Sequence, residues 1–439
     1  MAPAVVAVDF GATSIRVCLV ELGDGPPVLQ VVHRYSHEPE VDPAGTLRWR
    51  WSRLVAEMEK GLAAALERGP VASIGVDTWG VDYGLLDHRG DLVAPPVSYR
   101  DHRTDGFREL VDRIGAAELF TRTGVQLQPF NTLFQLAAHD PAELGRARHV
   151  LLLPELLVHH LTGARLGERT SAGTTQLVDI SSGHWSPELL DAIGLEASWF
   201  PEILPAGHRA GTWHGVPVHL VGGHDTASAV VGMGATGGEG TAFASGGTWL
   251  LVGCEQEHPR LDDLAREQNL TNEVGALGGY RVLKNLAGAW LVERARAAWG
   301  TRDISALVEE AAELPPGATV DVADPRFLNP VDMHAEIVAA AGLGSDVDAA
   351  VVVRCVIDSL AHGAARVVGQ LGGAERIELF GGLARWRPLR DRLAELSGTP
   401  VGTGPIEATA VGNALTQGVA LGVYADLADA RRHLGEGPP

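Results

Sequence analysis

The chain has 439 residues, of which 45% are hydrophobic and 21% charged, a composition typical of a globular protein with two or three domains. The 55 acidic and 35 basic residues give a formal net charge of −20. This charge argues against nucleic acid or an anionic membrane as a main partner, because both require a basic surface. No apolar run reaches the length of a membrane span, and the N-terminus lacks a signal-peptide pattern.

The first 164 residues begin with strands and continue mainly with helices. Apolar and alternating runs predict strands over 4–9, 15–22 and 28–35, with a small-residue turn at 11–14. Helical periodicity follows over 50–68, then a strand, a turn at Gly80 and a second strand over 71–87. The segment 104–164 is expected to be mostly helical, with breaks at Gly124, Pro129 and Pro154.

The second half repeats the early pattern after an irregular polar segment, 165–215. An apolar strand over 216–221 stops at Gly222-Gly223 and is followed by His224, Asp225 and a helix. A strand, a small-residue turn and a strand are predicted over 240–255, and short strands in "RIELFGG" and "TPVGTG". Helices are predicted over 284–299, 303–313, 346–371, 386–397 and 408–422, and the tail after 430 is expected to fray.

Two hairpins of similar pattern, "VDFGATSIRVCL" and "ASGGTWLLVG", indicate an internal duplication of a β-rich unit with added helices. The sequence therefore predicts an N-terminal domain over 1–234, a C-terminal domain over 235–427 and a polar tail over 428–439. The boundary is placed near 232–238, within "GMGATGGE". Three widely spaced cysteines form no C-x-x-C pair, which favours reduced thiols in a cytoplasmic protein.

The first hairpin turn has the chemistry of an anion site. Its small residues leave backbone N–H groups open, and the hydroxyls of Thr13 and Ser14 add donors. Asp9, at the end of the preceding strand, could hold a metal ion directly or through water. A plain hairpin explains this stretch equally well, since it is neither a Walker A loop nor a G-x-G-x-x-G fingerprint. The turn in "SGGTWLLVG" offers the same chemistry a second time and favours a phosphate site.

Asp225 stands at a junction of strand and helix behind two glycines, where it is either a helix cap or a catalytic base. "GVDTWGVDYGLLD" places acids and a hydroxyl beside Trp79, around Gly80, a set that suits a polyol ligand. The alternative is that Trp79 belongs to the core and Asp82 to a turn. The adjacent His159 and His160 point in different directions on a helix and predict no metal cluster.

From about Val5 to Leu427 the chain resembles the FGGY carbohydrate kinases. The resemblance rests on motifs in a fixed order, which are "DTWGVDYGLLD", "SYRDHRTDG", "RTGVQLQPFNTLFQL", "TSAGTTQLVD", "GHDTASAVV", "GTWLLVG", "NLTNEVGALGGYRVLKN" and "PIEATAVGN". It implies an α/β architecture, the duplicated actin-like ATPase (ribonuclease H-like) fold, with two domains and a cleft between them. It also implies phosphorylation of a ketose at its 1-hydroxyl by ATP with Mg²⁺, L-rhamnulose being the favoured ketose.

The resemblance assigns roles to individual residues. Asp225 is the proton acceptor, and the expected sugar contacts are Gly80, His224, Asp225, Thr226 and Asn285. The expected nucleotide contacts are Ala12, Thr13, Ser14, Ile15, Arg16, Thr248, Glu293 and Gly382. Asp9 is expected to help position Mg²⁺. The expected partners are a small ketose and ATP, with neither nucleic acid nor membrane, and the oligomeric state is left open.

The chain departs from the family pattern at three positions. Ile15 replaces a frequent glycine, Glu293 replaces a glutamine expected near ATP, and Leu383-Ala384-Arg385 follows Gly381-Gly382 in place of a third glycine and polar residues. Three alternatives stay open at this point: a kinase of L-fuculose, xylulose or ribulose, a weakly catalytic sugar-sensing protein on the same fold, and a dinucleotide oxidoreductase. The missing dinucleotide fingerprint and the doubled hairpin argue against the last of these.

Overall fold

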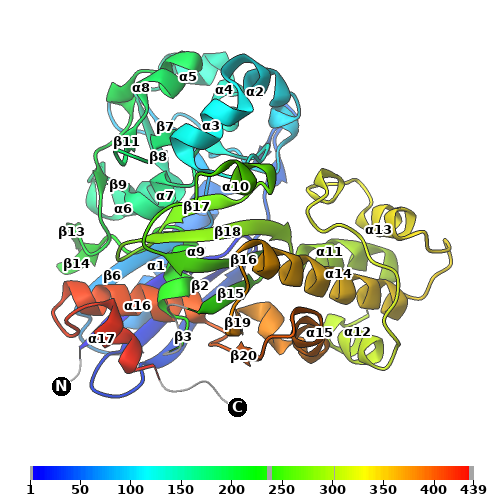
Figure 1. The fold of residues 1–439 in the computed structure, drawn as a ribbon. Coiled ribbons are helices and arrows are strands. Elements are labelled where there is room, and N and C mark those ends of the chain that lie inside the picture. Colours follow the sequence, from blue (N-terminus) through cyan, green and yellow to red (C-terminus); the bar gives the residue numbers. More distant parts are fainter. Residues whose placement is uncertain (1–2, 235–239, 301, 435–439) are drawn as a thin grey trace. The chain divides into compact units, whose positions relative to one another are not determined.

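The computed structural model describes residues 3–234, 240–300 and 302–434. The chain forms two compact units, drawn as a ribbon in Figure 1. The first consists of Met1–Ala235, Gln256–Arg281 and Glu407–Glu436, and the second of Thr236–Glu255, Val282–Ile406 and Gly437–Pro439. The segments Gln256–Arg281 and Glu407–Glu436 thus belong to the first unit, whereas the sequence prediction placed 256–281 and 407–427 in the C-terminal domain. The predicted boundary after residue 234 adjoins 235–239, which lie outside the described residues.

The first unit is built on a six-stranded mixed sheet with the order β13-β14-β6-β1-β2-β3. Its strands are β1 (Ala4–Phe10), β2 (Ser14–Glu21), β3 (Val28–Ser36), β6 (Ser73–Thr78), β13 (Arg209–Trp213) and β14 (Val216–His219). β1 pairs antiparallel with β2 and parallel with β6, and β6 pairs parallel with β14. The central position of β1 explains its nearly continuous apolar sequence, AVVAVDF, in which all residues after the first are buried.

Helices cover both faces of this sheet. Val5, Ala7, Cys18 and Val20 pack with residues of α16 (Ala408–Ala420), which lies against β1 and β6 (Figure 1). Val17 points the other way, toward α1 (Trp51–Leu66), because successive side chains of a strand alternate between faces. Asp9 lies two residues after Ala7 and four after Val5, so it shares the face covered by α16.

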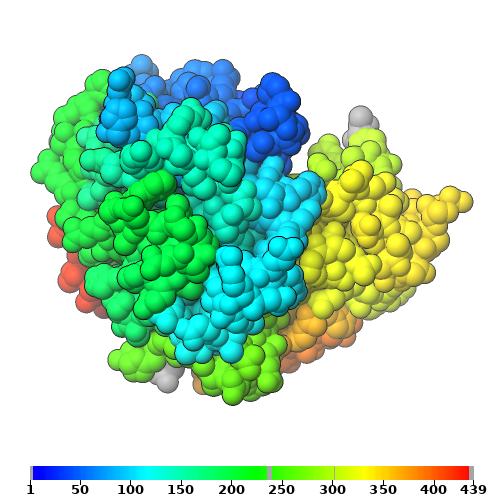
Figure 2. Space-filling view, turned by 90° about the horizontal axis from the view of Figure 1, so that it is seen from above, coloured from blue at the N-terminus to red at the C-terminus, as the bar shows by residue number. Residues whose placement is uncertain are grey.

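The remaining elements of the first unit are short. Its other helices are α2 (Arg108–Ile114), α3 (Ala116–Thr123), α4 (Thr132–Ala137), α5 (Pro141–Arg146), α6 (Leu153–Thr162), α7 (Arg169–Ala172), α8 (Pro187–Ala192), α9 (Asp225–Val231), α10 (Asp263–Glu267) and α17 (Leu427–Arg432). Its two-residue to four-residue strands are β4 (Glu40–Val41), β5 (Leu47–Arg48), β7 (Tyr83–Leu86), β8 (His149–Leu152), β9 (Gly167–Glu168), β10 (Val178–Asp179), β11 (His184–Trp185), β12 (Ile203–Leu204) and β17 (Thr271–Val274). In the space-filling view of Figure 2, the cyan and green segments 100–230 form much of the visible surface of this unit.

The second unit repeats the strand pattern of the first. Its strands are β15 (Thr241–Gly246), β16 (Trp249–Gln256), β18 (Tyr280–Ala287), β19 (Arg376–Phe380) and β20 (Val401–Thr403), in the order β18-β16-β15-β19-β20. β15 pairs antiparallel with β16 and parallel with β19, and β19 pairs parallel with β20, just as β1 pairs with β2 and β6, and β6 with β14. The predicted duplication is therefore present in the topology.

Helices of the second unit enclose its largest apolar cluster. They are α11 (Trp290–Ala295), α12 (Ile304–Ala312), α13 (Met333–Ala341), α14 (Ala349–Gln370) and α15 (Arg387–Ser397). The long helix α14 buries most of its length, from Val352 to Val368, against α12, α15 and strand residues such as Ala242 and Val252. Its apolar stripe recurs at helical spacing, as the sequence predicts for residues 346–371.

Three predicted elements are wrong. Residues 284–287 belong to strand β18, and the helix predicted from 284 begins only at Trp290. Strand β8 (His149–Leu152) interrupts the predicted helical segment, with Pro154 in the first turn of α6. The predicted polar tail contains α17, whose Ala430 is buried, and residues 435–439 of that tail lie outside the described residues. The first two errors concern short apolar runs, where periodicity does not distinguish strand from helix.

Among the described helices, none is both long and apolar enough to cross a membrane. The three cysteines form no disulfide in the described part of the chain.

Candidate active site

The central feature of the candidate site is the junction between β14 and α9. The chain leaves β14, passes Gly222-Gly223 and enters α9 with Asp225 as its first helical residue. His224 occupies the N-cap position in an extended conformation and makes no side-chain capping bond. Capping is therefore not the role of Asp225, although a negative charge in the first turn is favoured by the helix dipole.

Asp225 combines a desolvated setting with an accessible carboxylate. Its side chain keeps 26% exposure, and burial raises its pKa above the ordinary value, while His224 opposes that rise. The His224 Nε2 atom lies 3.5 Å from Asp225 Oδ1, and Thr226 Oγ1 donates a hydrogen bond to the same oxygen at 3.2 Å. A carboxylate made more basic yet still reachable is suited to accept a proton from a ligand hydroxyl.

Two further charged residues flank His224 on its other side. Glu273 Oε2 lies 3.2 Å from His224 Nδ1, and Arg281 Nη2 lies 3.0 Å from the same Glu273 oxygen. Sequence reasoning missed both, although they lie in "NLTNEVGALGGYRVLKN", from which only Asn285 was selected. One signal could have found Glu273: it is the only acid in the short segment TNEV, which forms strand β17. In the structure its side chain is 5% exposed.

Buried hydrogen bonds fix the backbone that carries His224 and Asp225. Gly223 N donates to Glu168 Oε2 at 3.0 Å, and His224 N donates to Thr170 Oγ1 at 3.2 Å. From the other side, Thr78 N donates to Gly223 O at 2.9 Å. Glu168 and Thr170 come from the polar segment that the sequence predicted to be irregular, so their supporting role was also missed.

Gly80 lies directly beside this junction. A Cβ atom added at Gly80 would lie 3.2 Å from Thr174 Oγ1 and 3.3 Å from the His224 ring. Any side chain at residue 80 would therefore crowd His224. Four of the five predicted sugar contacts, namely Gly80, His224, Asp225 and Thr226, thus occur together in the first unit.

Trp79 proves to be a core residue. It is 5% exposed, its ring lies 4.4 Å from the Trp49 ring, and its Nε1–H donates to Asp82 Oδ2 at 2.9 Å. Trp49 Nε1 donates to the same oxygen at 2.6 Å. The indole and the Asp82 carboxylate therefore satisfy each other, which favours the alternative that Trp79 belongs to the core over its role beside a polyol ligand.

Asp9 and Asp77 are registered neighbours on the parallel strands β1 and β6. Burial raises the pKa of Asp9 to about 6, and that of Asp77 well above its ordinary value. Asn413 Nδ2 donates to Asp77 Oδ2 at 2.6 Å. Arg16 Nη2 lies 3.0 Å from Asp9 Oδ2, while its Nη1 reaches Glu407 at 3.0 Å. The guanidinium of Arg16, a predicted nucleotide contact, thus forms ion pairs with both Asp9 and Glu407.

The surroundings of Asp9 fit a divalent cation bound through water. Both Asp9 carboxylate oxygens are buried and accept no hydrogen bond from the described residues, although Arg16 provides an ion pair. The negative charge of Asp225 also contributes to the raised pKa of Asp9, so the two carboxylates act on the same region. Within the described residues no three acids, histidines or cysteines converge closely enough for direct ligation.

The predicted phosphate turn joins β1 to β2. Gly11 N donates to Ser14 O at 3.0 Å, which closes the turn. A Cβ atom at Gly11 would lie 3.0 Å from Arg16 Nη2 and 3.3 Å from Ser14 O, so a larger residue there would crowd the turn. Ile15 is fully buried, so its side chain is a core residue and only its backbone could serve a ligand.

The second unit carries the other predicted nucleotide and sugar contacts. Thr248 lies in the turn between β15 and β16, where its carbonyl accepts hydrogen bonds from Gly288 N and Trp290 N. Asn285 lies on β18, Glu293 is an exposed residue of α11, and Gly382 begins a 3₁₀ turn after β19. These placements leave their assigned roles as predictions.

Leu383 has a structural explanation. It is 1% exposed and belongs to the apolar cluster of the second unit. A Cβ atom at Gly246 would lie 2.6 Å from Leu383 Cβ, so the two backbones approach closely. The side chain that departs from the family pattern therefore fills the core beneath the turn.

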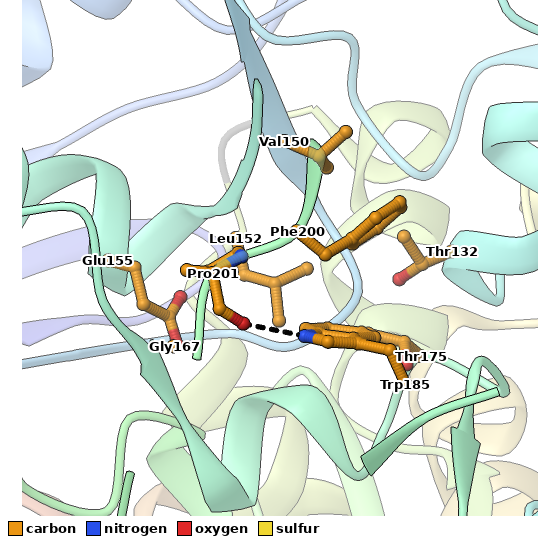
Figure 3. Close-up of a pocket in the computed structure, with 9 residues that line it drawn as sticks. All are labelled: Thr132, Val150, Leu152, Glu155, Gly167, Thr175, Trp185, Phe200 and Pro201. Carbon is orange, nitrogen blue, oxygen red and sulfur yellow. Dashed lines mark hydrogen bonds between the residues drawn. The ribbon is translucent and has the colours of Figure 1, made fainter. Parts of the chain in front are cut away.

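A separate pocket in the first unit contains none of the predicted site residues. It has an empty volume of about 260 Å³, open solvent included, and is lined by Thr132, Val150, Leu152, Glu155, Gly167, Thr175, Trp185, Phe200 and Pro201 (Figure 3). Trp185 Nε1 donates to Pro201 O at 2.7 Å, which closes one side. Glu155 links this pocket to the site, because its Oε1 accepts a hydrogen bond from Glu168 N at 2.9 Å.

Comparisons with known proteins agree with this organisation. The model of the N-terminal domain of the FGGY family of carbohydrate kinases matches residues 4–232, and that of the C-terminal domain matches residues 242–421. Proteins named rhamnulokinase from Klebsiella pneumoniae and Pectobacterium carotovorum are each 39% identical, covering 97% and 98% of this chain and 91% and 90% of theirs.

Solved structures support the same fold at lower identity. A xylulose kinase from Lactobacillus acidophilus superposes with a TM-score of 0.81 at 15% identity, covering 99% of this chain and 93% of the other. A gluconate kinase from the same organism gives a TM-score of 0.80 at 15% identity, with 100% and 93% coverage. The predicted duplicated actin-like ATPase fold is confirmed, and the chain belongs to the FGGY family of carbohydrate kinases.

Proposed function

We propose that this sugar kinase transfers the γ-phosphoryl group of ATP to the 1-hydroxyl of L-rhamnulose. The observation that carries the proposal is Asp225, an accessible carboxylate of raised pKa, beside His224 and Gly80. The names of the rhamnulokinase relatives favour L-rhamnulose among the ketoses. Because ATP is made and consumed inside cells, we place the reaction in the cytoplasm.

Asp225 accepts the proton of the attacking hydroxyl. Phosphoryl transfer passes through a loose transition state, so the protein contributes mainly positioning and charge compensation. The hydroxyl oxygen attacks phosphorus as its proton moves to an Asp225 oxygen, and the bond from phosphorus to the bridging oxygen of ADP breaks. The bond from Thr226 Oγ1 to Asp225 Oδ1 keeps the carboxylate rotamer fixed during this step.

The sugar is held by groups around the same junction. His224 offers a ring nitrogen, Thr226 a hydroxyl, and Gly80 an open approach to the backbone, because no Cβ atom occupies the space next to His224. Asn285 is assigned as a further sugar contact. Fixed donors and acceptors orient the 1-hydroxyl and exclude other orientations, which is the main source of rate in a positioning mechanism.

The nucleotide is assigned to backbone and side-chain groups of both hairpins. The N–H groups from Ala12 to Arg16 donate to phosphate oxygens, and Thr248, Glu293 and Gly382 contact the rest of the nucleotide. Asp9 is the residue that would hold Mg²⁺ through water, since its buried oxygens accept no hydrogen bond from the described residues. When bound, Mg²⁺ neutralises phosphate charge.

The direct test of the base is Asp225→Asn, which preserves size and the acceptor for Thr226 but removes the proton-accepting oxygen. We expect turnover to fall by about 10²–10⁴-fold, the usual contribution of a general base, with the KM for MgATP little changed. Asp263→Asn is the matched control, because Asp263 is likewise the first residue of its helix, α10, and is 89% exposed. Near-normal turnover by Asp225→Asn would exclude the proposed base.

The substrate is tested by following ADP release with MgATP and a panel of ketoses. We expect the highest kcat/KM for L-rhamnulose. A higher value for L-fuculose, xylulose or ribulose would retain the mechanism and replace the substrate. Binding of MgATP without turnover of any ketose would contradict the proposal as a whole.

A further inference from the structure

The turn assigned to the phosphates is held from behind by one histidine. His37 follows β3, and its backbone N–H donates to Thr13 O at 3.0 Å. Its side-chain Nε2 lies 3.0 Å from Gly11 O. Since a carbonyl oxygen only accepts, the Nε2 atom must carry the hydrogen. One residue thus fixes two carbonyl groups of the same short turn.

These bonds determine which way the neighbouring amides point. In a trans peptide the C=O and N–H groups point in opposite directions. Fixing Gly11 O toward His37 therefore directs the Ala12 N–H away from His37, and fixing Thr13 O does the same for the Ser14 N–H. Both amides belong to the set assigned to the phosphate group.

The His37 ring packs against the indole rings of Trp49 and Trp79, and Asp82 fixes both of these indoles. Its ring lies 5.5 Å from the Trp49 ring and 5.6 Å from the Trp79 ring. Both indole N–H groups are fixed by Asp82 Oδ2, and Trp79 N donates to Phe10 O at 3.1 Å. Gly80, beside the Asp225 junction, is the next residue after Trp79. The side chains of Trp49, Trp79 and Asp82 therefore connect the backbone of the turn with the backbone of the sugar side.

We infer that His37 is a positioning residue that aims the amides of the Gly11–Ser14 turn at the phosphates of ATP. The inference rests on the proposed function, because it takes this turn as the phosphate site. Burial lowers the pKa of His37 to about 4, so the ring stays neutral between pH 5 and 9 and its role is that of a fixed donor.

The test compares His37→Leu, which removes the donor, with His37→Gln, whose amide can still donate to Gly11 O. For His37→Leu we expect the KM for MgATP to rise about tenfold, as the loss of one hydrogen bond predicts, with the KM for the ketose unchanged. His37→Gln should stay within about twofold of the natural protein, and both should show its pH profile.

His33→Leu is the matched control. His33 lies on β3, the strand that precedes His37, and its Nε2 is 2.8 Å from Glu57 Oε2, so a comparable bond is lost without touching the turn. If His37→Leu does not fold, His37→Phe replaces it, because a phenyl ring can still pack against Trp49 and Trp79. A KM for MgATP in folded His37→Leu or His37→Phe equal to that of the natural protein would overturn the inference.

The outcomes separate this inference from the proposed function. If the natural protein turns over no ketose and binds no MgADP in a calorimetric titration, the proposed function fails. If the natural protein is active and every folded His37 variant shares its KM for MgATP, the proposed function stands and the role of His37 fails. Equal losses in His37→Gln and His37→Leu would also overturn it, because the donor would then be irrelevant.

Discussion

Buried acids dominate the chemistry of the first unit, and each behaves according to its partners. Asp82 accepts two indole N–H groups, Asp77 an amide of Asn413, and Asp9 an ion pair with Arg16. Asp225 alone among these four keeps substantial exposure. This difference in accessibility, more than any difference in pKa, supports the proposed proton-accepting role of Asp225.

Glu155 predicts a measurable pH dependence of stability. Burial, with a contribution from the charge of Glu168, raises its pKa from the ordinary 4.5 to about 8. The folded state therefore holds this proton more tightly than the unfolded state does, and the stabilisation is fully present below about pH 4.5 and lost as the pH rises through 8. Glu155→Gln cannot ionise, so its melting temperature should exceed that of the natural protein increasingly from pH 5 to pH 8.5.

Thermal melts at several pH values check this expectation. Glu67→Gln, an exposed residue after α1, serves as the control and should follow the natural protein throughout. Apart from Glu168, whose charge interacts with that of Glu155, the buried acids are expected to titrate alike in all three proteins, so the difference between the melting curves reports Glu155 and its interaction with Glu168. Parallel curves for Glu155→Gln and the natural protein would contradict the assigned pKa.

At the scale of elements, the position of α9, the helix that carries the proposed base, depends on a close helix crossing. α9, which begins with Asp225, packs on α16 through Gly232 and Gly412. A Cβ atom at Gly412 would lie 1.7 Å from Ser228 O, and one at Gly232 would lie 2.1 Å from Ala408 O. Neither backbone can therefore accept even a methyl group without moving the other helix.

Gly412→Ala should displace α9 and lower both stability and activity. Overpacking of this kind costs about 1–3 kcal/mol of unfolding free energy, and a displacement of about 1 Å at the base costs up to about 100-fold in turnover. The measurements are denaturant unfolding and kcat. Gly369→Ala in α14 is the matched control, because no atom lies within 4 Å of the added Cβ position and alanine favours a helix. An active, equally stable Gly412→Ala protein would show that the crossing does not position Asp225.

At the scale of the whole molecule, the first unit is discontinuous in sequence. Residues 407–436 return to it after the second unit, and α16 contributes Ala410, Ala414 and Leu415 to the core around Val5. Asn413 and Gln417 also hydrogen-bond to Asp77 and to the Val6 carbonyl. The first 235 residues therefore lack part of their own core.

A chain ending at residue 406 should consequently fail to form the first unit. We expect lost near-ultraviolet dichroism from the buried Trp49 and Trp79, and no cooperative melting of that unit, in comparison with the full chain. Adding the separate peptide 407–436 should restore part of the signal, since the missing segment is the cause. A native-like spectrum and melt for the shortened chain would show that α16 is dispensable.

Local pattern in the sequence predicted the hairpins, the long helix α14, the turn at Gly80 and the strand-to-helix junction at Asp225. These features depend on neighbouring residues, because periodicity, glycine and helix-start signals act within a few residues. Resemblance added the family and the roles of the site residues, and the family is confirmed. Strand β18 was missed because its short apolar run fits a helix as well as a strand.

The tertiary structure decided which distant residues meet. It brought Glu273 and Arg281 to His224, Glu168 to Gly223, and His37 to Gly11. It also assigned Trp79 and Leu383 to the core. Such pairings depend on long-range contacts, burial and the loss of hydration, and none of these can be read from the local periodicity of one sequence. The local motifs of the sequence therefore determine which functional groups are present, whereas the burial and the partners that set the pKa and accessibility of each group arise only on folding.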